Sequence, residues 1–154
     1  MLGSLALTLV LGEDRRMVES EAVCEGLRTF YERFSAHDPD RFEEVIATGA
    51  GVSVIGSAPG EGHGDRASWL AAYRESIARL GITLEGGPDV RAWEEGSAGF
   101  AVDEPRFVLP DGSFLPTRLT AVLHREGELW KIVHLHFSVG VPDEAAVQPP
   151  AAGG

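Results

Sequence analysis

The segment 128–140 alternates between two chemically different sets of side chains, which predicts a β-strand with one face on a core. The segment 117–125 has the same period, so the two form a hairpin across the three-residue link 126–128. This link would place Arg125 opposite Leu129 and fix the register of the hairpin. The predicted strand pairs are Leu119 with Leu135, Ala121 with Val133, Thr120 with His134, and Arg118 with His136.

This register gives the hairpin one apolar face, which we predict to be core, and one mixed face. The mixed face would leave Trp130 and Ile132 in water in a monomer, yet it is too polar for a core. We therefore predict that it pairs with the same face of a second copy in a symmetric homodimer. The predicted interface residues are Arg118, Thr120, Val122, Trp130, Ile132, His134, His136 and Ser138.

The rest of the chain divides into helical and strand-like patterns. Helical spacing of apolar residues predicts helices over 18–36, 41–46 and 65–80, with Asp38 or Asp40 capping the second and Asp65 the third. A short strand at 52–56 leads into a glycine-rich loop at 57–64. Further strands are predicted at 82–84, 89–94, 99–109 and 114–125. Helices followed by antiparallel strands favour an α+β fold with the helices on one face of a sheet.

The length of 154 residues and the hydrophobic content of 44% are typical of one domain, which we place at 17–141. Residues 1–16 form an N-terminal extension whose apolar run lacks a basic start and is shorter than the ~20 residues of a membrane span. We expect a flexible extension, a cytoplasmic protein and a disordered Pro/Ala/Gly tail at 142–154.

The formal net charge of −11 and the pI near 4.8 disfavour nucleic acid and membranes as partners, because the long-range field repels both. Cys24 is the single cysteine, which excludes an internal disulfide and any cysteine cluster. His134 and His136 point the same way in a strand, but no carboxylate or third histidine converges on them. We predict no metal site and no cofactor.

The order of these elements, with the segments GHGDRASWLAAYRE and HREGELWKIVHLHFSVGVP, resembles the nuclear transport factor 2-like superfamily in its SnoaL-like branch. The last strands also resemble the association domain of calcium/calmodulin-dependent protein kinase II, where Trp, His-x-His and Ser have the spacing of Trp130, His134, His136 and Ser138. The resemblance implies a homodimer of cones, each with a strongly curved antiparallel sheet wrapped around about three helices and a pocket. Relatives include isomerases, dehydratases, polyketide cyclases and assembly domains, so the fold does not choose the function.

The resemblance does not extend to the residues that carry ketosteroid isomerase chemistry. Phe30 stands where those enzymes have a tyrosine, with Tyr31 one step further round the helix. The segment 55–57 offers no carboxylate for the general base, and Ala121 takes the place of the second aspartate. We therefore predict that the chain is not a true ketosteroid isomerase. The pocket arginines of the kinase domain correspond to Ala121 and Phe137.

Two functions remain open at this point: a small-molecule enzyme or binder acting on a hydrophobic metabolite, and a non-catalytic dimerisation or assembly module. Candidate catalytic groups are Asp103, Glu104 and Tyr31, although a carboxylate paired with Arg106 or exposed at a strand edge is the plainer interpretation. His63 is interpreted as a solvated loop residue. The predicted pocket residues, for which core packing is the alternative, are Phe30, Tyr31, Trp69, Tyr73, Phe100, Asp103, Ala121 and Phe137.

Overall fold

The first long helix, α1 (Glu21–Ser35), begins where Ser20 accepts a hydrogen bond from the Val23 amide at 3.1 Å. This computed structural model describes residues 16–147. The prediction of a helix from residue 18 is wrong by three residues, because Val18–Glu19 form a short strand, β1, that pairs with β5 (Arg91–Glu95). The buried side of α1 follows the predicted period: Val23, Cys24, Leu27, Phe30, Tyr31 and Phe34.

Two aspartates start the other helices, as predicted. Asp38 caps α2 (Pro39–Glu43), and Asp65 caps α3 (Arg66–Ala72) by accepting from the Ser68 amide at 2.8 Å. The third helix then widens into a π-helical segment, η1 (Tyr73–Ile77), and continues as α4 (Ala78–Leu80). None of the helices within residues 16–147 is long and apolar enough to cross a membrane.

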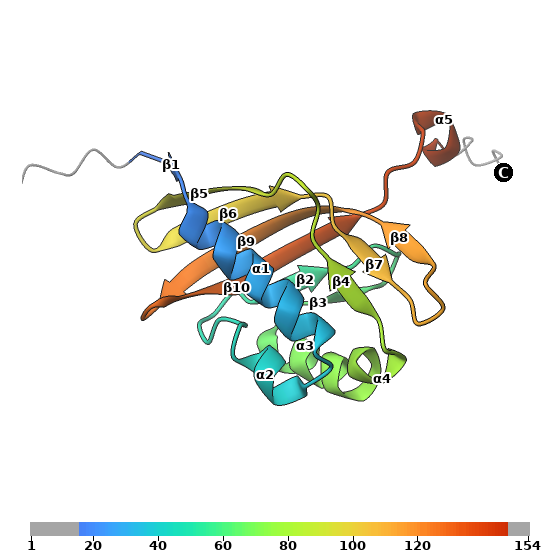
Figure 1. Cartoon of the computed structure of the whole chain (residues 1–154), viewed down its shortest axis with the longest axis horizontal. Coiled ribbons are helices and arrows are strands. Elements are labelled where there is room, and N and C mark those ends of the chain that lie inside the picture. The colour runs from blue at the N-terminus through green and yellow to red at the C-terminus, as the bar shows by residue number, and fades with distance from the viewer. Residues whose placement is uncertain (1–15, 148–154) are drawn as a thin grey trace, which may run out of the picture.

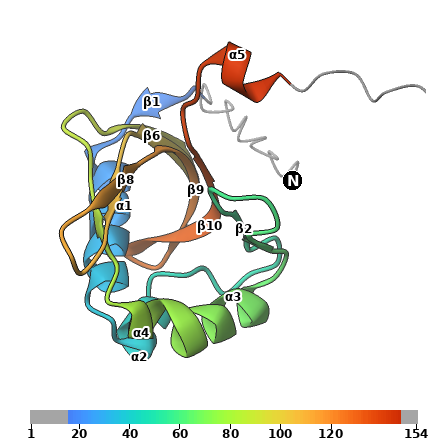
Figure 2. The same cartoon turned by 90° about the vertical axis from the view of Figure 1, so that its right-hand side faces the viewer.

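The strands form two sheets, and the α+β class is confirmed. The seven-stranded sheet has the order β1-β5-β6-β9-β10-β2-β3, with β2 parallel to β10 and the other pairs antiparallel. The remaining bounds in this sheet are β2 (Ser53–Ile55), β3 (Gly62–His63), β6 (Ala98–Asp103), β9 (Arg118–Glu126) and β10 (Leu129–Ser138). Figure 1 shows α1 crossing the face of this sheet, and Figure 2 shows the sheet curving around the core with α3 and α4 closing one end.

A smaller sheet of three strands has the order β4-β7-β8, with bounds β4 (Thr83–Glu85), β7 (Arg106–Val108) and β8 (Phe114–Pro116). The long strand predicted at 99–109 is broken because Pro105 cannot donate to a ladder. Its carbonyl instead accepts from the amide and the hydroxyl of Thr117, at 2.9 and 2.8 Å. The chain therefore leaves one sheet and enters the other at this point.

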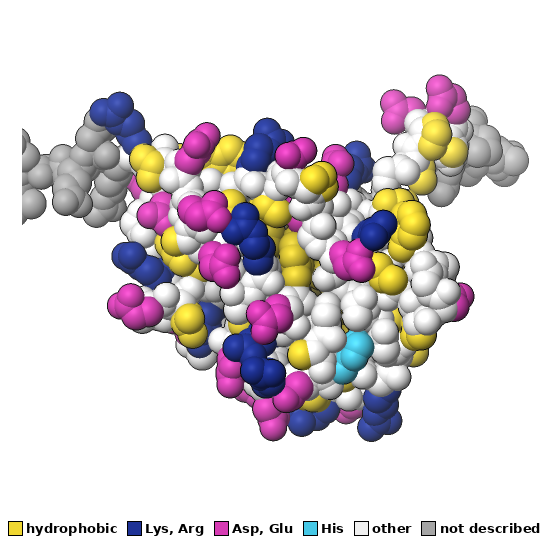
Figure 3. Space-filling model, viewed as in Figure 1, with side chains coloured by type: hydrophobic (Ala, Val, Ile, Leu, Met, Phe, Trp, Pro, Cys, Tyr) yellow, Lys and Arg dark blue, Asp and Glu magenta, His cyan; other side chains and the backbone are white. Residues whose placement is uncertain are grey.

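The ends of the described chain lie apart from the core. A short exposed helix, α5 (Asp143–Ala146), lies inside the segment that was predicted to be a disordered tail. It projects away from the sheets in Figure 1. The predicted N-terminal extension, residue 16 excepted, and the end of the tail lie outside the described residues. Figure 3 shows acidic and basic side chains interspersed over the face that carries α1, where Arg28 pairs with Glu21 at 2.6 Å.

The β9–β10 hairpin differs from the predicted register. The turn has two residues, Gly127 and Glu128, with Gly127 at a φ of 63°, so Glu126 pairs with Leu129. The register then shifts between Ile132 and His134, which leaves Val133 as the extra residue of a β-bulge. The predicted pair next to the turn is therefore wrong by one residue, and the four pairs beyond the bulge are wrong by two. The observed pairs beyond the bulge are His134 with Val122, Leu135 with Ala121, His136 with Thr120, Phe137 with Leu119, and Ser138 with Arg118.

The bulge changes which side chains face the core. Trp130 and Ile132 are 8% and 0% exposed, on the same concave side as Leu135 and Phe137. The prediction that Trp130 and Ile132 lie on the mixed outer face is wrong, because the extra residue inverts the alternation between Ile132 and His134. The other predicted interface residues keep the outer, convex side: Arg118, Thr120, Val122, His134, His136 and Ser138.

Candidate functional site

An apolar pocket of about 550 Å³ opens between the end of the third helix, the smaller sheet and the glycine-rich loop. Its walls carry four aromatic side chains from four different elements: Phe34 on α1, Trp69 on α3, Phe107 on β7 and Phe137 on β10. Leu80 and Leu109 stand at its edge and are 57% and 39% exposed. The pocket therefore has an aromatic interior and an aliphatic rim.

The π-helical segment η1 forms the helical side of this pocket. The wider turn brings Ser76 and Ile77 to the wall, and π-bulges are frequent at functional sites. Tyr73, at the start of this segment, points away from the pocket into the core. Its hydroxyl donates to the Phe34 carbonyl at 2.6 Å, and its ring stacks on Phe42 at 3.7 Å between centroids.

The glycine-rich loop contributes a histidine that we had interpreted as solvated. His63 lies in β3 and pairs with Val54, which in turn pairs with Leu135. Directly paired residues share a face of a sheet, so the imidazole of His63 lies on the concave side with the other two. His63 is partly buried and lines the pocket. Sequence reasoning missed this position because a strand of two residues carries too little pattern.

The loop that presents His63 is closed by its own hydrogen bonds. The Gly56 amide donates to the Glu61 carbonyl at 2.6 Å, and the Ala58 amide donates to the Glu61 carboxylate at 3.1 Å. A Cβ atom on Gly56 would lie 2.5 Å from the Cβ atom of Glu61, so the turn requires glycine there. Glu61 lines the pocket, but its carboxylate is engaged in holding the loop.

Two of the candidate catalytic groups form a buried pair elsewhere. The Tyr31 hydroxyl donates to Asp103 Oδ2 at 2.7 Å, and the Gly87 amide donates to the same oxygen at 3.0 Å. Asp103 is 6% exposed, and its Oδ1 has no hydrogen-bond partner among the described residues. Burial, together with the hydrogen bond to Asp103, raises the pKa of Tyr31 well above its ordinary value. The phenol therefore stays protonated at neutral pH and donates to Asp103, and the pair fastens α1 to the end of β6 outside the apolar pocket.

The third candidate, Glu104, is exposed at the end of β6. Arg106, which we had considered as a partner for Asp103 or Glu104, instead pairs with Glu85 at 2.7 Å. Glu104 and Arg106 flank Pro105, but the chain passes from β6 of the large sheet to β7 of the small sheet between them. Glu104 and Arg106 therefore do not form an ion pair with each other.

The predicted pocket set is only partly brought together. Trp69 and Phe137 line the pocket, whereas Phe30, Tyr31, Tyr73, Asp103 and Ala121 are buried outside it. Phe100 lies on the convex face, opposite Val122 and stacked on Trp93 at 4.9 Å between centroids. The placement of Phe100 in the cone is wrong because its neighbour Ala101 takes the inward position.

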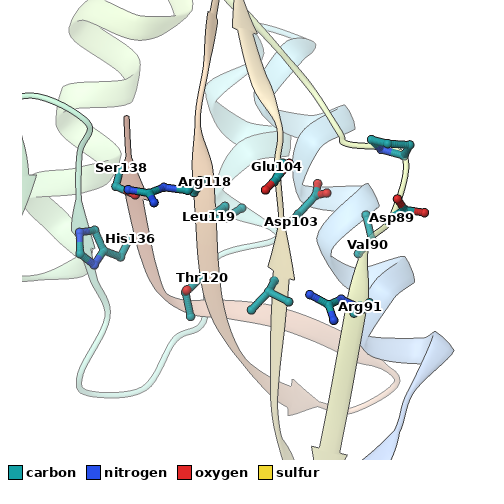
Figure 4. Close-up of a pocket in the computed structure, with 12 residues that line it drawn as sticks. Asp89, Val90, Arg91, Asp103, Glu104, Arg118, Leu119, Thr120, His136 and Ser138 are labelled. Atoms are coloured by element: carbon teal, nitrogen blue, oxygen red, sulfur yellow. The ribbon is translucent and has the colours of Figure 1, made fainter. Parts of the chain in front are cut away.

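A second concavity, of about 970 Å³, lies on the convex side of the sheet. Figure 4 shows Arg118 extending toward Ser138, with His136 and Thr120 nearby and the carboxylates of Asp89 and Glu104 across the groove. This outer groove therefore has basic and acidic side chains in one open depression. It contains four of the residues predicted for the dimer interface: Arg118, Thr120, His136 and Ser138.

The histidines of the convex face are not arranged around a metal position. His134 Nδ1 lies 2.8 Å from the Ser53 hydroxyl, and His136 is exposed in the outer groove. Within residues 16–147, no three His, Cys, Asp or Glu side chains come together in a group that could hold a metal ion.

The sequence matches the model of the SnoaL-like domain over residues 23–142. The chain belongs to the SnoaL-like family. No protein of curated function matches the sequence. This SnoaL-like chain is similar in structure to a proposed dehydratase of the nuclear transport factor 2-like family from Streptomyces avermitilis, with a TM-score of 0.67 and 20% identity over 79% of this chain and 96% of that one.

Two further solved structures share the fold of this SnoaL-like protein. A proposed ketosteroid isomerase from Shewanella frigidimarina has a TM-score of 0.61 and 15% identity over 77% of this chain and 96% of that one. A proposed calcium/calmodulin-dependent protein kinase II association domain from Xanthomonas campestris has a TM-score of 0.61 and 15% identity over 77% and 85%. At these identities the likeness establishes the fold and leaves the function open.

Proposed function

We propose that this SnoaL-like protein binds a small hydrophobic molecule in the apolar pocket. The supporting observation is the pocket's volume of about 550 Å³ with an aromatic wall contributed by four elements. Small-molecule sites in proteins are typically apolar concavities of roughly 300–1,000 Å³ with a few polar groups. The aromatic wall otherwise faces water, so a ligand that covers this apolar surface is favoured.

The proposal covers binding and leaves out ketosteroid isomerase chemistry. Two of the similar structures are proposed enzymes, a dehydratase and a ketosteroid isomerase, which supports a small molecule as the ligand. Phe30 and Ala121, which the resemblance places at two isomerase positions, are both buried and carry no proton-transfer group. Tyr31 and Asp103 bond to each other outside the pocket.

A pair of tryptophan substitutions on one helix tests the pocket. Ala72 lines the pocket and Ala71 is exposed beside it, so Ala72→Trp fills the space while Ala71→Trp adds the same side chain outside. Titration with the neutral dye Nile red should show saturable binding to the wild type and to Ala71→Trp. Ala72→Trp should weaken it at least tenfold while urea unfolding shows an intact fold. Equal binding by both variants, or no saturable binding by the wild type, would sink the proposal.

A second proposal concerns the convex face, which we infer to be the contact surface of a homodimer. Val122, 37% exposed, lies there beside the stacked pair of Trp93 and Phe100, and Ile55, 47% exposed, lies on β2 next to His136. A contiguous patch of exposed apolar side chains on a protein surface typically marks a contact with another protein, and a second copy would bury this one. The outer groove supports a two-fold contact, because each copy offers both signs of charge: Arg91 and Arg118 against Asp89 and Glu104.

Sedimentation velocity at micromolar concentration tests this dimer. The wild type should sediment as a dimer, and Val122→Asp should shift it to a monomer because the new charge would be buried in the contact. Val147→Asp changes a side chain that is 74% exposed on the far end of α5 and should leave the dimer intact. A monomeric wild type would refute the inference.

A further inference from the structure

The apolar pocket contains very few groups that could recognise a polar atom of a ligand. Among its lining residues within the described part of the chain, the ionisable side chains are Glu61 and His63. The Glu61 carboxylate accepts from the Ala58 amide at 3.1 Å, whereas the imidazole of His63 has no hydrogen-bond partner among residues 16–147. The imidazole of His63 is therefore the ionisable group of the wall that stays available to a ligand.

The sheet register directs that imidazole inward. His63 pairs with Val54, and the adjacent Gly62 pairs with Ile55, which is 47% exposed on the outer side. Alternation along β3 thus sends Gly62 outward and His63 toward the side of Trp69 and Phe137. When an apolar ligand displaces water from this wall, the imidazole loses its solvent partner. A buried nitrogen without a partner costs roughly 1–3 kcal/mol, so a ligand that supplies one is favoured.

The charges around His63 select the kind of polar group. Glu61 lines the same wall, and Asp65 follows His63 by two residues at the start of α3. The chain as a whole carries a formal net charge of −11. A ligand carboxylate would meet this negative surrounding, whereas a neutral hydroxyl donates a hydrogen bond to the unprotonated imidazole nitrogen without adding charge.

We propose that His63 is a specificity-determining residue that accepts a hydrogen bond from a phenol-like or enol-like hydroxyl on an otherwise apolar ligand. This inference rests on the proposed function of the apolar pocket. His63 sits at one end of the aromatic wall, so the ligand's flat apolar body lies among Phe34, Phe107 and Phe137 with its hydroxyl toward β3.

Two serine hydroxyls are the competing partners for such a group. Ser57 and Ser76 also line the pocket, and no hydrogen bond within the described residues engages either side chain. Ser76 is exposed on the π-helical segment, so it meets water even when the pocket is filled. The imidazole is less accessible to water than Ser76, so it gains more from a hydrogen bond with a ligand. Replacing each serine with alanine shows whether it, and not His63, accepts the hydrogen bond.

Three probes of the same size measure the effect: naphthalene, 2-naphthol and 2-naphthoate, each by equilibrium dialysis at neutral pH. The informative quantity is the affinity ratio of 2-naphthol to naphthalene. One net hydrogen bond of ~1 kcal/mol corresponds to a ratio about fivefold higher in the wild type than in His63→Leu. His63→Gln, which keeps an acceptor, should retain part of the preference. His124→Leu, which removes an exposed histidine on the convex side, should retain all of it. The wild type should bind 2-naphthoate more weakly than 2-naphthol.

The outcomes separate this inference from the proposed function. If His63→Leu weakens naphthalene and 2-naphthol by the same factor, His63 only shapes the pocket and the inference is overturned. If Ser57→Ala or Ser76→Ala, and not His63→Leu, removes the preference, the hydroxyl partner is that serine and the inference is overturned. If naphthalene binds and Ala72→Trp abolishes that binding while the ratio is unchanged in His63→Leu, the pocket stands and the role of His63 falls. If the wild type binds none of the probes, both proposals fall.

Discussion

Replacing Tyr31 with phenylalanine should destabilise the fold more than the same change at Tyr73. Tyr31→Phe keeps the ring but removes the hydroxyl that donates to Asp103 Oδ2 at 2.7 Å. The carboxylate is 6% exposed and would retain only the Gly87 amide at 3.0 Å, since its Oδ1 has no partner among the described residues. A hydrogen bond to a charged group contributes ~1.5–3 kcal/mol, and the uncompensated burial adds to the loss. We expect a loss of about 2–4 kcal/mol in the free energy of unfolding.

Tyr73→Phe is the matched control, because that hydroxyl is also buried but donates to a neutral carbonyl, that of Phe34, at 2.6 Å. A neutral bond of this kind contributes about 0.5–1.5 kcal/mol. Urea unfolding at neutral pH, followed by circular dichroism, gives both values, and an unchanged m-value shows that the same surface is exposed. Adding Asp103→Leu to each tyrosine variant isolates the coupling between Tyr31 and Asp103, expected above ~1 kcal/mol.

A smaller loss of unfolding free energy for Tyr31→Phe than for Tyr73→Phe, or zero coupling between Tyr31 and Asp103, would contradict this expectation. Tyr31→Phe should also leave binding of a neutral probe to the apolar pocket unchanged, because the pair lies outside that pocket. If Tyr31→Phe folds normally but no longer binds the probe, Tyr31 and Asp103 contribute to the binding site.

Two further changes test other parts of the structure. Burial raises the pKa of Tyr73 to about 12 and also raises that of Tyr31, so the native protein should show at most about a tenth of one tyrosine's phenolate absorbance near 295 nm at pH 11. Unfolded tyrosines lose their protons near pH ~10, so stability should fall from about that pH up to the folded pKa; early phenolate absorbance without unfolding contradicts this. Gly26→Ala should destabilise by ~1–3 kcal/mol despite the better helix propensity of alanine, because its Cβ would lie 2.7 Å from that of Trp130. Gly49→Ala, with open space around it, should change the free energy of unfolding by less than ~0.5 kcal/mol.

Local chemistry made the helices predictable from the sequence. Ser20, Asp38 and Asp65 each accept amide hydrogen bonds at a helix start, and two of these caps are identifiable from their spacing to the apolar stripe. The first was missed because Val18 continues the apolar pattern backwards although it belongs to a strand. The break at Pro105 was visible in the sequence, but a proline alone does not say that the chain changes sheets there.

The pocket was less predictable than the helices. Helical periodicity separates buried from exposed side chains, but it does not separate a residue that fills a core from one that lines a cavity. Tyr73 and Trp69 lie on the same stripe and both are buried, yet Tyr73 is enclosed by Phe42 and the Phe34 carbonyl while Trp69 also lines the pocket. That difference depends on how strands distant in the sequence, such as β7 and β10, pack against the helix. The periodicity of the helix itself carries no information about that packing.

The β-bulge at Val133 is the feature that decides the outer face of the sheet. Along 129–138, a strict alternation would group Trp130 and Ile132 with the histidines, whereas a shift of phase at Val133 places them with Leu135 and Phe137. Burying such side chains stabilises the fold by roughly 1.5–3 kcal/mol each. This gain offsets the local loss of strand pairing at Val133.

The shift occurs where the neighbour of β10 changes. Ile132 exchanges two hydrogen bonds of 2.8 Å with the backbone of Val45 and Ala47, and β2 takes over from His134. The bulge therefore accommodates two successive neighbours while keeping every large apolar side chain of β10 from Trp130 onward inside. The convex face is left without its two largest predicted anchors, so a homodimer there must draw its apolar contact from Val122, Ile55 and the Trp93–Phe100 pair. Since these side chains lie on β9, β2, β5 and β6, the contact spreads across the sheet instead of along one hairpin, and a single charge at Val122, near its centre, is the change to which it should be most sensitive.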